Sequence, residues 1–165
     1  MRLTGLTAAL LIAAAPAAGF VAVPAAPVRG TAAPAAAQAP LPRTALTLIA
    51  GREKRRYAVE LARTPAQQAA GMMFRRKMAR DEGMLFPFAR AEPGVSFWME
   101  NTILPLDIIF IGSDARVINI AADCKPLSRN FVYAAGPTLA VLELNGGEAA
   151  RIGLRPGDKV DYTLP

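Results

Sequence analysis

The stretch "SFWMENTILPLDIIFI", Ser96–Ile111, decides much of the fold because it joins two apolar runs through a polar interruption. Short runs of β-branched and aromatic residues, separated by proline and polar residues, are typical of β-strands connected by a turn. We therefore expect one strand over residues 95–100 and another over residues 106–111. The polar residues between them predict the connecting turn.

Similar short strands are expected on both sides of this stretch. The segments 44–50 and 56–62 alternate apolar and polar residues around the turn-like "GREK", which predicts a β-hairpin. Residues 83–88 and 116–121 predict two more strands, by composition and by their flanking glycine and aspartate residues. Residues 123–137 have no periodic pattern, and we expect them to form the longest loop.

Helices are expected in two places. Thr64, Pro65 and Gln67 form a capping-box pattern, which predicts a short helix from Pro65 to about Phe74. Residues 138–164 have the pattern of a strand, a short helix, a tight turn and a strand. These elements together predict a mostly β domain with one or two short helices, folded as a small barrel-like or sandwich β domain.

The first 40 residues differ in composition from the rest of the chain. Arg2 is followed by an uncharged stretch over residues 3–28 and by an Ala/Pro-rich spacer, which is the order typical of a secretory signal. A retained membrane anchor is the alternative, because the uncharged stretch exceeds the roughly 20 residues that a spanning helix needs. We expect residues 1–40 to be signal peptide and spacer, and 41–165 to be one domain, periplasmic or extracellular after cleavage.

The absence of histidine restricts the chemistry. No catalytic triad or dyad that uses histidine can form, and no imidazole is present to bind a metal ion. Cys124 is the only cysteine, which excludes an intramolecular disulfide. The methionines are spread through apolar segments, which favours core packing over copper binding. We therefore predict no metal and no cofactor, and we assign no catalytic residue.

The charge balance does not predict a nucleic-acid partner. The chain has 19 basic and 13 acidic residues, and its densest basic run, "REKRRY" at Arg52–Tyr57, is interrupted by Glu53. Nucleic-acid binding typically needs a clustered basic face with stacking aromatic residues. We expect membrane association only through an uncleaved leader. The sequence leaves the oligomeric state open.

Several phrases resemble those of the DUF192 family, also called UPF0127, over about Leu46–Leu164. They are "GMMFRR", "DEGMLFPF", the central stretch quoted above and the terminal "LELNGGEAARIGLRPGDKV". The resemblance implies a small, mostly β, barrel-like domain that is commonly exported, and it implies no established activity. The chain departs from the family at two points. It has Glu100 where lysine is frequent, and its long loop contains one cysteine where the family often has more than one. The terminal phrase also resembles the end of a PDZ domain, over some fifteen residues only.

The polar residues of the central stretch predict a binding site. In an extended strand, Trp98 lies on the face opposite Phe97 and Met99, so it faces a surface or a groove. An aromatic wall with a few converging polar groups is how small-molecule sites are usually built, and a sugar is one ligand that would fit. The candidate ligand-binding residues are Trp98, Asn101, Thr102, Asp107, Glu82, Arg75 and Glu143.

Other interpretations of the same residues stay open. Asn101, Thr102 and Asp107 could instead stabilise a turn by hydrogen-bonding to nearby backbone. Asp107 and Glu143 could act as the paired carboxylates of a hydrolase that needs no histidine. A third function, as a structural partner in an envelope complex, would require an exposed apolar patch. We expect a binding or accessory module with a small-molecule pocket near Trp98.

Overall fold

The computed structural model describes residues 37–164, so the predicted signal peptide lies outside the described residues. Within residues 37–164, no helix is long and apolar enough to cross a membrane. The elements of this part of the chain are β1 (Arg43–Ala50), β2 (Glu53–Leu61), α1 (Pro65–Ala70), β3 (Glu82–Glu92), β4 (Ser96–Phe97), β5 (Leu106–Ile111), β6 (Val117–Cys124), β7 (Val132–Tyr133), β8 (Thr138–Asn145), α2 (Glu148–Ile152) and β9 (Lys159–Tyr162). The prediction of a mostly β domain with one or two short helices is confirmed, and the structure has two.

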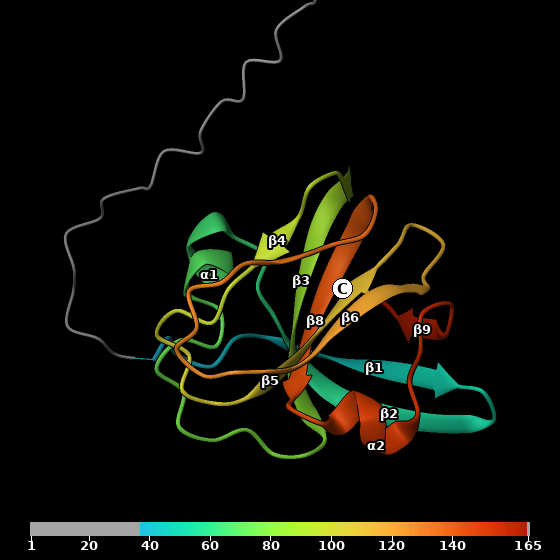
Figure 1. Cartoon of the computed structure of the whole chain (residues 1–165), viewed down its shortest axis with the longest axis horizontal. Coiled ribbons are helices and arrows are strands. Elements are labelled where there is room, and N and C mark those ends of the chain that lie inside the picture. The colour runs from blue at the N-terminus through green and yellow to red at the C-terminus, as the bar shows by residue number, and fades with distance from the viewer. Residues whose placement is uncertain (1–36, 165) are drawn as a thin grey trace, which may run out of the picture. The chain divides into compact units, whose positions relative to one another are not determined.

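Seven strands form one curled sheet, a half-barrel, in the order β6, β5, β8, β3, β2, β1 and β9 (Figure 1). Neighbouring strands are antiparallel except β2 and β3, which are parallel. The hairpin predicted from residues 44–62 is present as β1 and β2. Strands β4 and β7 form a separate two-stranded sheet.

The two edge strands of the curled sheet meet at one end. Arg116, just before β6, forms an isolated bridge with Lys159 of β9. The backbone N–H of Val117 donates to the carbonyl of Asp158 at 2.9 Å, and that of Val160 donates to Ala115 at 2.8 Å. These hydrogen bonds pair some of the backbone groups of the two edge strands. Unpaired backbone groups at a sheet edge can form hydrogen bonds with other chains.

The curled sheet has an apolar cluster on each face. The cluster on the concave face draws residues from all seven strands, among them Leu48, Ile109 and Leu142. The cluster on the convex face includes Ile108 and Phe110 and is confined to the β3, β8, β5 and β6 side of the sheet. Because successive residues of a strand point to opposite faces, β5 contributes to both clusters. All six of its residues are buried for that reason.

The predicted helix is shorter than expected. The capping box at Thr64 is present, but α1 ends at Ala70 instead of Phe74. Gly71 has a φ of 45°, and its N–H donates to the carbonyl of Gln67. A positive φ is accessible to glycine at little steric cost and ends the helix.

Two predictions about strands and loops also need correction. Of the strand expected over residues 95–100, only Ser96–Phe97 pairs, because its partner β7 is two residues long and Asn101 turns the chain at φ 55°. The loop expected over residues 123–137 contains β7, and Cys124 still belongs to β6. The short strands β4 and β7 cover the convex cluster, so β4 lies against the sheet instead of within it.

Candidate functional site

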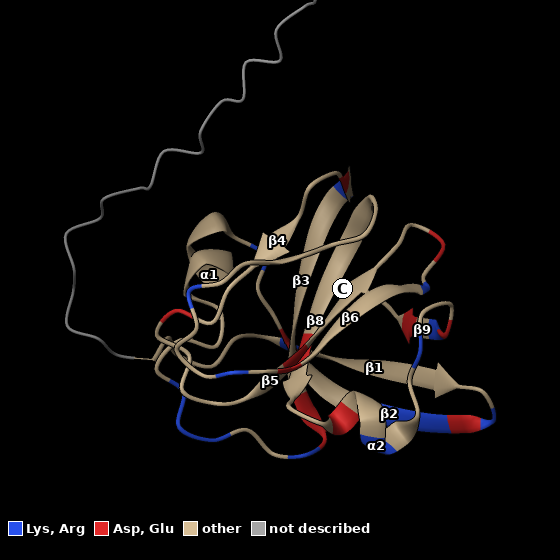
Figure 2. Cartoon of the chain, in the orientation of Figure 1, with Lys and Arg blue, Asp and Glu red and all other residues tan. Residues whose placement is uncertain are grey.

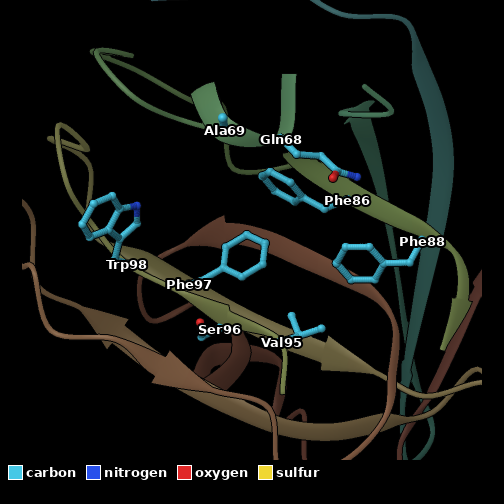
Figure 3. A pocket seen from close by; sticks show the side chains of 8 residues that line it. All are labelled: Gln68, Ala69, Phe86, Phe88, Val95, Ser96, Phe97 and Trp98. Atoms are coloured by element: carbon cyan, nitrogen blue, oxygen red, sulfur yellow. The ribbon is translucent and has the colours of Figure 1, made fainter. Parts of the chain in front are cut away.

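A groove opens on the convex side of the sheet, between α1 and β4 (Figure 3). Its volume is about 300 Å³. The elements that border it, α1 and β4, carry no charged residue, and Figure 2 shows both in tan. The lining residues are Gln68, Ala69, Phe86, Phe88, Val95, Ser96, Phe97 and Trp98.

The groove is apolar because of the alternation in β3. Phe86 and Phe88 are two residues apart and therefore point to the same face of the strand. Phe97 of β4 packs edge-on against Phe86, with ring centroids 5.0 Å apart and an interplanar angle of 86°. Figure 3 shows these rings in the space between α1 and β4. Helix α1 buries none of its residues, so it borders the space without filling it.

Trp98 stands at one end of the groove, with 39% of its surface exposed. Its indole ring stacks on Phe131, with centroids 5.3 Å apart and an interplanar angle of 8°. Phe131 in turn contacts Tyr133 of β7, with centroids 6.2 Å apart. Trp98 therefore links the groove to an exposed aromatic row, which we define as Trp98, Phe131 and Tyr133.

A smaller cavity of about 40 Å³ adjoins the groove. The two spaces share Gln68, Ala69, Phe86, Phe97 and Trp98 as lining residues. The cavity is also lined by Ala70, Gly71, Met72, Met73, Thr102 and Glu143.

Among residues 37–164, Glu143 is the only ionisable residue that lines the small cavity. It lies on β8 opposite Met84 of β3 and Ile108 of β5, both of which belong to the convex cluster. Within residues 37–164, no hydrogen-bond donor reaches its Oε2 atom. Burial raises the pKa of Glu143 to about 8, because the charged carboxylate is poorly solvated among apolar side chains.

Asp107 lies away from the groove. Its Oδ1 atom accepts from the N–H of Asp123 at 2.7 Å and of Gly147 at 3.0 Å, and Oδ2 accepts from Ala149 at 2.6 Å. The carboxylate thus ties β5 to the end of β6 and to the start of α2. These partners are distant in sequence, so Asp107 bonds to remote backbone and not to the nearby backbone of a local turn.

Asn101 and Thr102 form part of the turn after Met99. The carbonyl of Asn101 accepts from the N–H of Phe74 at 2.8 Å, and Thr102 Oγ1 donates to the carbonyl of Glu100 at 3.3 Å. Asn101 is exposed, whereas Thr102 is buried and lines the small cavity.

Arg75 and Glu82 hold neighbouring elements together outside the groove. Arg75 forms a two-pronged ion pair with Glu60 of β2, with N–O distances of 2.9 and 2.7 Å. Glu82 pairs with Arg43 of β1 at 2.7 Å. Neither residue lines the groove or the small cavity. Of the seven predicted residues, the structure brings together Trp98, Thr102 and Glu143.

The sequence interpretation missed most of the apolar wall. Phe86 and Phe88 had a usable signal, their two-residue spacing within a predicted strand. Gln68 had none, because a polar residue in a short helix is ordinarily solvated. Phe131 lay in a segment without periodicity, and only the fold places it against Trp98.

The described residues offer no obvious metal centre or activated thiol. Among residues 37–164, no group of three or more His, Cys, Asp or Glu side chains is placed to hold a metal ion. Cys124 is half-buried. Burial first, and then the charges of Asp107, Glu143 and Asp123, raise the pKa of its thiol, whereas reactive thiols have a lowered pKa.

The fold and the groove define a small β half-barrel domain with an aromatic groove on its convex face. The chain belongs to the DUF192 family, described as Uncharacterized ACR, whose sequence profile matches residues 47–162. The family assignment made from the sequence is therefore confirmed.

Two solved structures are similar to this chain. One is a protein of unknown function from Novosphingobium aromaticivorans, with 47% identity, a TM-score of 0.72, and coverage of 81% of this chain and 99% of that one. The other, from Sinorhizobium meliloti, is described as a candidate transcription regulator, with 39% identity, a TM-score of 0.72, and coverage of 76% and 97%. No curated protein matches the chain.

Proposed function

We propose that this chain is an exported binding module, and that a small molecule with an apolar body binds in the groove beside Trp98. The observation that carries the proposal is the groove itself, a space of about 300 Å³ walled by three phenylalanines and Trp98. Small-molecule sites are usually concave, mostly apolar and about 300–1,000 Å³ in volume. The groove is at the lower end of this range, so it suits a ring or a short chain.

A sugar is one candidate ligand, since its apolar face stacks on exposed aromatic rings such as that of Trp98. Gln68 and Ser96 are the polar residues of the groove lining. The Gln68 side-chain amide already donates to the carbonyls of Ala62 and Pro87. Because so few polar groups are left for sugar hydroxyls, we rank ligands with a larger apolar surface ahead of sugars.

The export part of the proposal rests on the leader. Residues 1–40 combine a basic start, an uncharged stretch and an Ala/Pro-rich spacer, which is the pattern of a secretory signal. Expression of the full chain in a Gram-negative host, followed by mass determination of the periplasmic protein, tests this part. A protein of full mass retained in the membrane fraction would support an anchor instead.

A docking function in an envelope complex is the second candidate. The aromatic row favours it, because Trp98, Phe131 and Tyr133 are 39%, 49% and 62% exposed. Contiguous exposed apolar residues mark interaction sites more often than isolated ones do. A side chain that fills the groove should leave the binding of a partner to the aromatic row unchanged. The same change should abolish the binding of a small molecule in the groove.

We do not propose a nucleic-acid partner, although one solved relative is described as a candidate transcription regulator. Helix α1 has six residues and α2 has five, which is short for a helix that reads base edges in the major groove. Figure 2 shows basic residues at the start of β2, but Glu53 interrupts the run and pairs with Arg55 at 3.5 Å.

A thermal-shift screen of the protein purified after expression of the full chain tests the binding function. The screen compares aromatic and aliphatic small molecules, amines, sugars and peptides. A ligand at about 100 times its Kd stabilises the native state by about 2.7 kcal/mol, which raises Tm by roughly 5–15 °C. Trp98 is the only tryptophan, so a change in tryptophan fluorescence on titration locates binding near the groove. Stabilising ligands that leave this fluorescence unchanged would contradict the proposed site.

A further inference from the structure

We propose that Glu143 is the polar end of the ligand site, and that the ligand is a primary amine on an aromatic or aliphatic body. Its ammonium group occupies the small cavity and its apolar body lies in the groove. This inference rests on the proposed function and adds the chemical class of the ligand.

The unpartnered carboxyl of Glu143 is exceptional among the buried acids of the described chain. The other three, Glu60, Asp107 and Glu148, each accept hydrogen bonds from side-chain or backbone donors. No donor within residues 37–164 reaches Oε2 of Glu143. A buried polar atom without a hydrogen bond is costly, so the position favours a donor supplied from outside the protein.

The size of the small cavity limits what that donor can be. The cavity has a volume of about 40 Å³, and a water-sized group needs about 10–15 Å³ for its centre. An ammonium group, which is close to water in size, fits. A bulkier charged head such as a guanidinium, with its planar fork of five N–H groups, is a poor match for so small a space.

The walls of the cavity also favour a cation. The lining includes the aromatic residues Phe97 and Trp98 and the methionines Met72 and Met73. An aromatic ring attracts a nearby ammonium group through its negative face, most strongly when the ring is tryptophan. An anion in the same position would face the carboxyl of Glu143, and none of the described lining residues is basic.

The groove lies next to the cavity and can hold the apolar body of the ligand. The groove and the cavity share Phe86, Phe97 and Trp98 among their walls. A molecule whose ammonium group sits beside Glu143 therefore has its adjoining carbon atoms near the phenylalanine rings. An arylalkylamine such as 2-phenylethylamine matches this order of a small cationic end and an apolar body.

Binding of such an amine changes the protonation of Glu143. Burial raises its pKa to about 8, so the free protein holds this carboxyl mostly neutral at pH 7. A bound ammonium favours the carboxylate, and the proton of Glu143 passes to the solvent. The other cavity-lining residues in the described part of the chain have no ionisable side chain. The charge of Glu143 also raises the pKa of the Cys124 thiol, so ionisation of Glu143 keeps this thiol protonated.

The test compares 2-phenylethylamine with 2-phenylethanol, its neutral analogue, by titration of tryptophan fluorescence at pH 7. The wild-type protein is expected to bind the amine at least tenfold more tightly than the alcohol. Glu143→Gln is expected to weaken amine binding at least tenfold and to leave alcohol binding within twofold. Glu100→Gln, close to Trp98 in sequence but outside the cavity lining, is the control and should change neither affinity.

Calorimetry of the wild-type protein in two buffers of different ionisation enthalpy gives a second measurement that needs no variant. We expect release of nearly one proton per bound amine at pH 7. Equal affinity for amine and alcohol, or amine binding without proton release, would overturn the inference while leaving the groove as a binding site. If neither compound nor any other in the screen binds, the inference and the proposed function both fail.

Discussion

Asp107 and Glu143 lie one register position apart on adjacent strands, and their side chains point to opposite faces of the sheet. Asp107 pairs with Leu144 and Glu143 pairs with Ile108 across β5 and β8. Leu144 belongs to the concave cluster and Ile108 to the convex one. The sheet therefore separates the two carboxyl groups, and we do not propose the hydrolase in which they act together on one substrate.

Asp107→Asn should destabilise the domain. The amide keeps one acceptor oxygen but turns an NH₂ group toward backbone donors, so at least one of three charge-assisted bonds is lost. We expect a loss of about 2–4 kcal/mol in the free energy of unfolding, measured by urea denaturation. Asp161→Asn, on an exposed residue of β9, is the control and should change stability by less than about 0.5 kcal/mol. Equal stability of the two variants would contradict the structural role of Asp107.

Arg75→Met should destabilise the domain without affecting the groove. Glu60 is largely buried, and removal of Arg75 leaves its carboxylate without its two-pronged partner. Removal of one partner of a buried ion pair typically lowers the free energy of unfolding by about 3–5 kcal/mol. We expect a loss near the lower limit because Arg75 is partly exposed. Arg76→Met, on the exposed neighbour, is the matched control. Ligand affinity of the folded variant should equal that of the wild-type protein.

The contribution of Glu143 to stability should decrease as the pH rises from about 4.5 to 8. The pKa of Glu143 is about 8 in the folded protein, against an ordinary value of 4.5, so this group binds more protons in the native state than in the unfolded chain in this range. Each pKa unit corresponds to about 1.4 kcal/mol, so the loss amounts to several kcal/mol at most. Glu143→Gln cannot titrate at this position. The stability difference between wild type and variant, measured by denaturation at pH 5 to 9, should therefore shift with pH. A constant difference would argue against the raised pKa.

Sequence patterns correctly predicted the elements that depend on interactions between residues close together in the chain. The capping box at Thr64 and the hairpin around Gly51 depend on residues close in sequence. The unbroken apolar run of β5 indicated a strand, and the structure explains it by an apolar cluster on each face.

The remaining features depend on contacts between distant segments. Asp107 finds its hydrogen-bond donors 16 to 42 residues away, so no local pattern distinguished it from a site residue. Strand β7 is two residues long and forms only because β4 lies beside it. The stacking of Phe131 on Trp98 likewise depends on the fold. The sequence singled out Trp98, which lines the groove in the structure, whereas most of the other groove walls became visible only in three dimensions.

The most direct test of the central claim is the affinity of a groove-blocking variant for a ligand found in the screen. Ala69 lines the groove from an exposed position on α1, so Ala69→Leu fills the space and keeps a good helix former. Ala66→Leu adds the same side chain to the same helix outside the groove lining. We predict that Ala69→Leu weakens binding at least tenfold, by tryptophan fluorescence titration, and that Ala66→Leu binds as the wild-type protein does. Equal affinity of the two folded variants would contradict ligand binding in the groove beside Trp98.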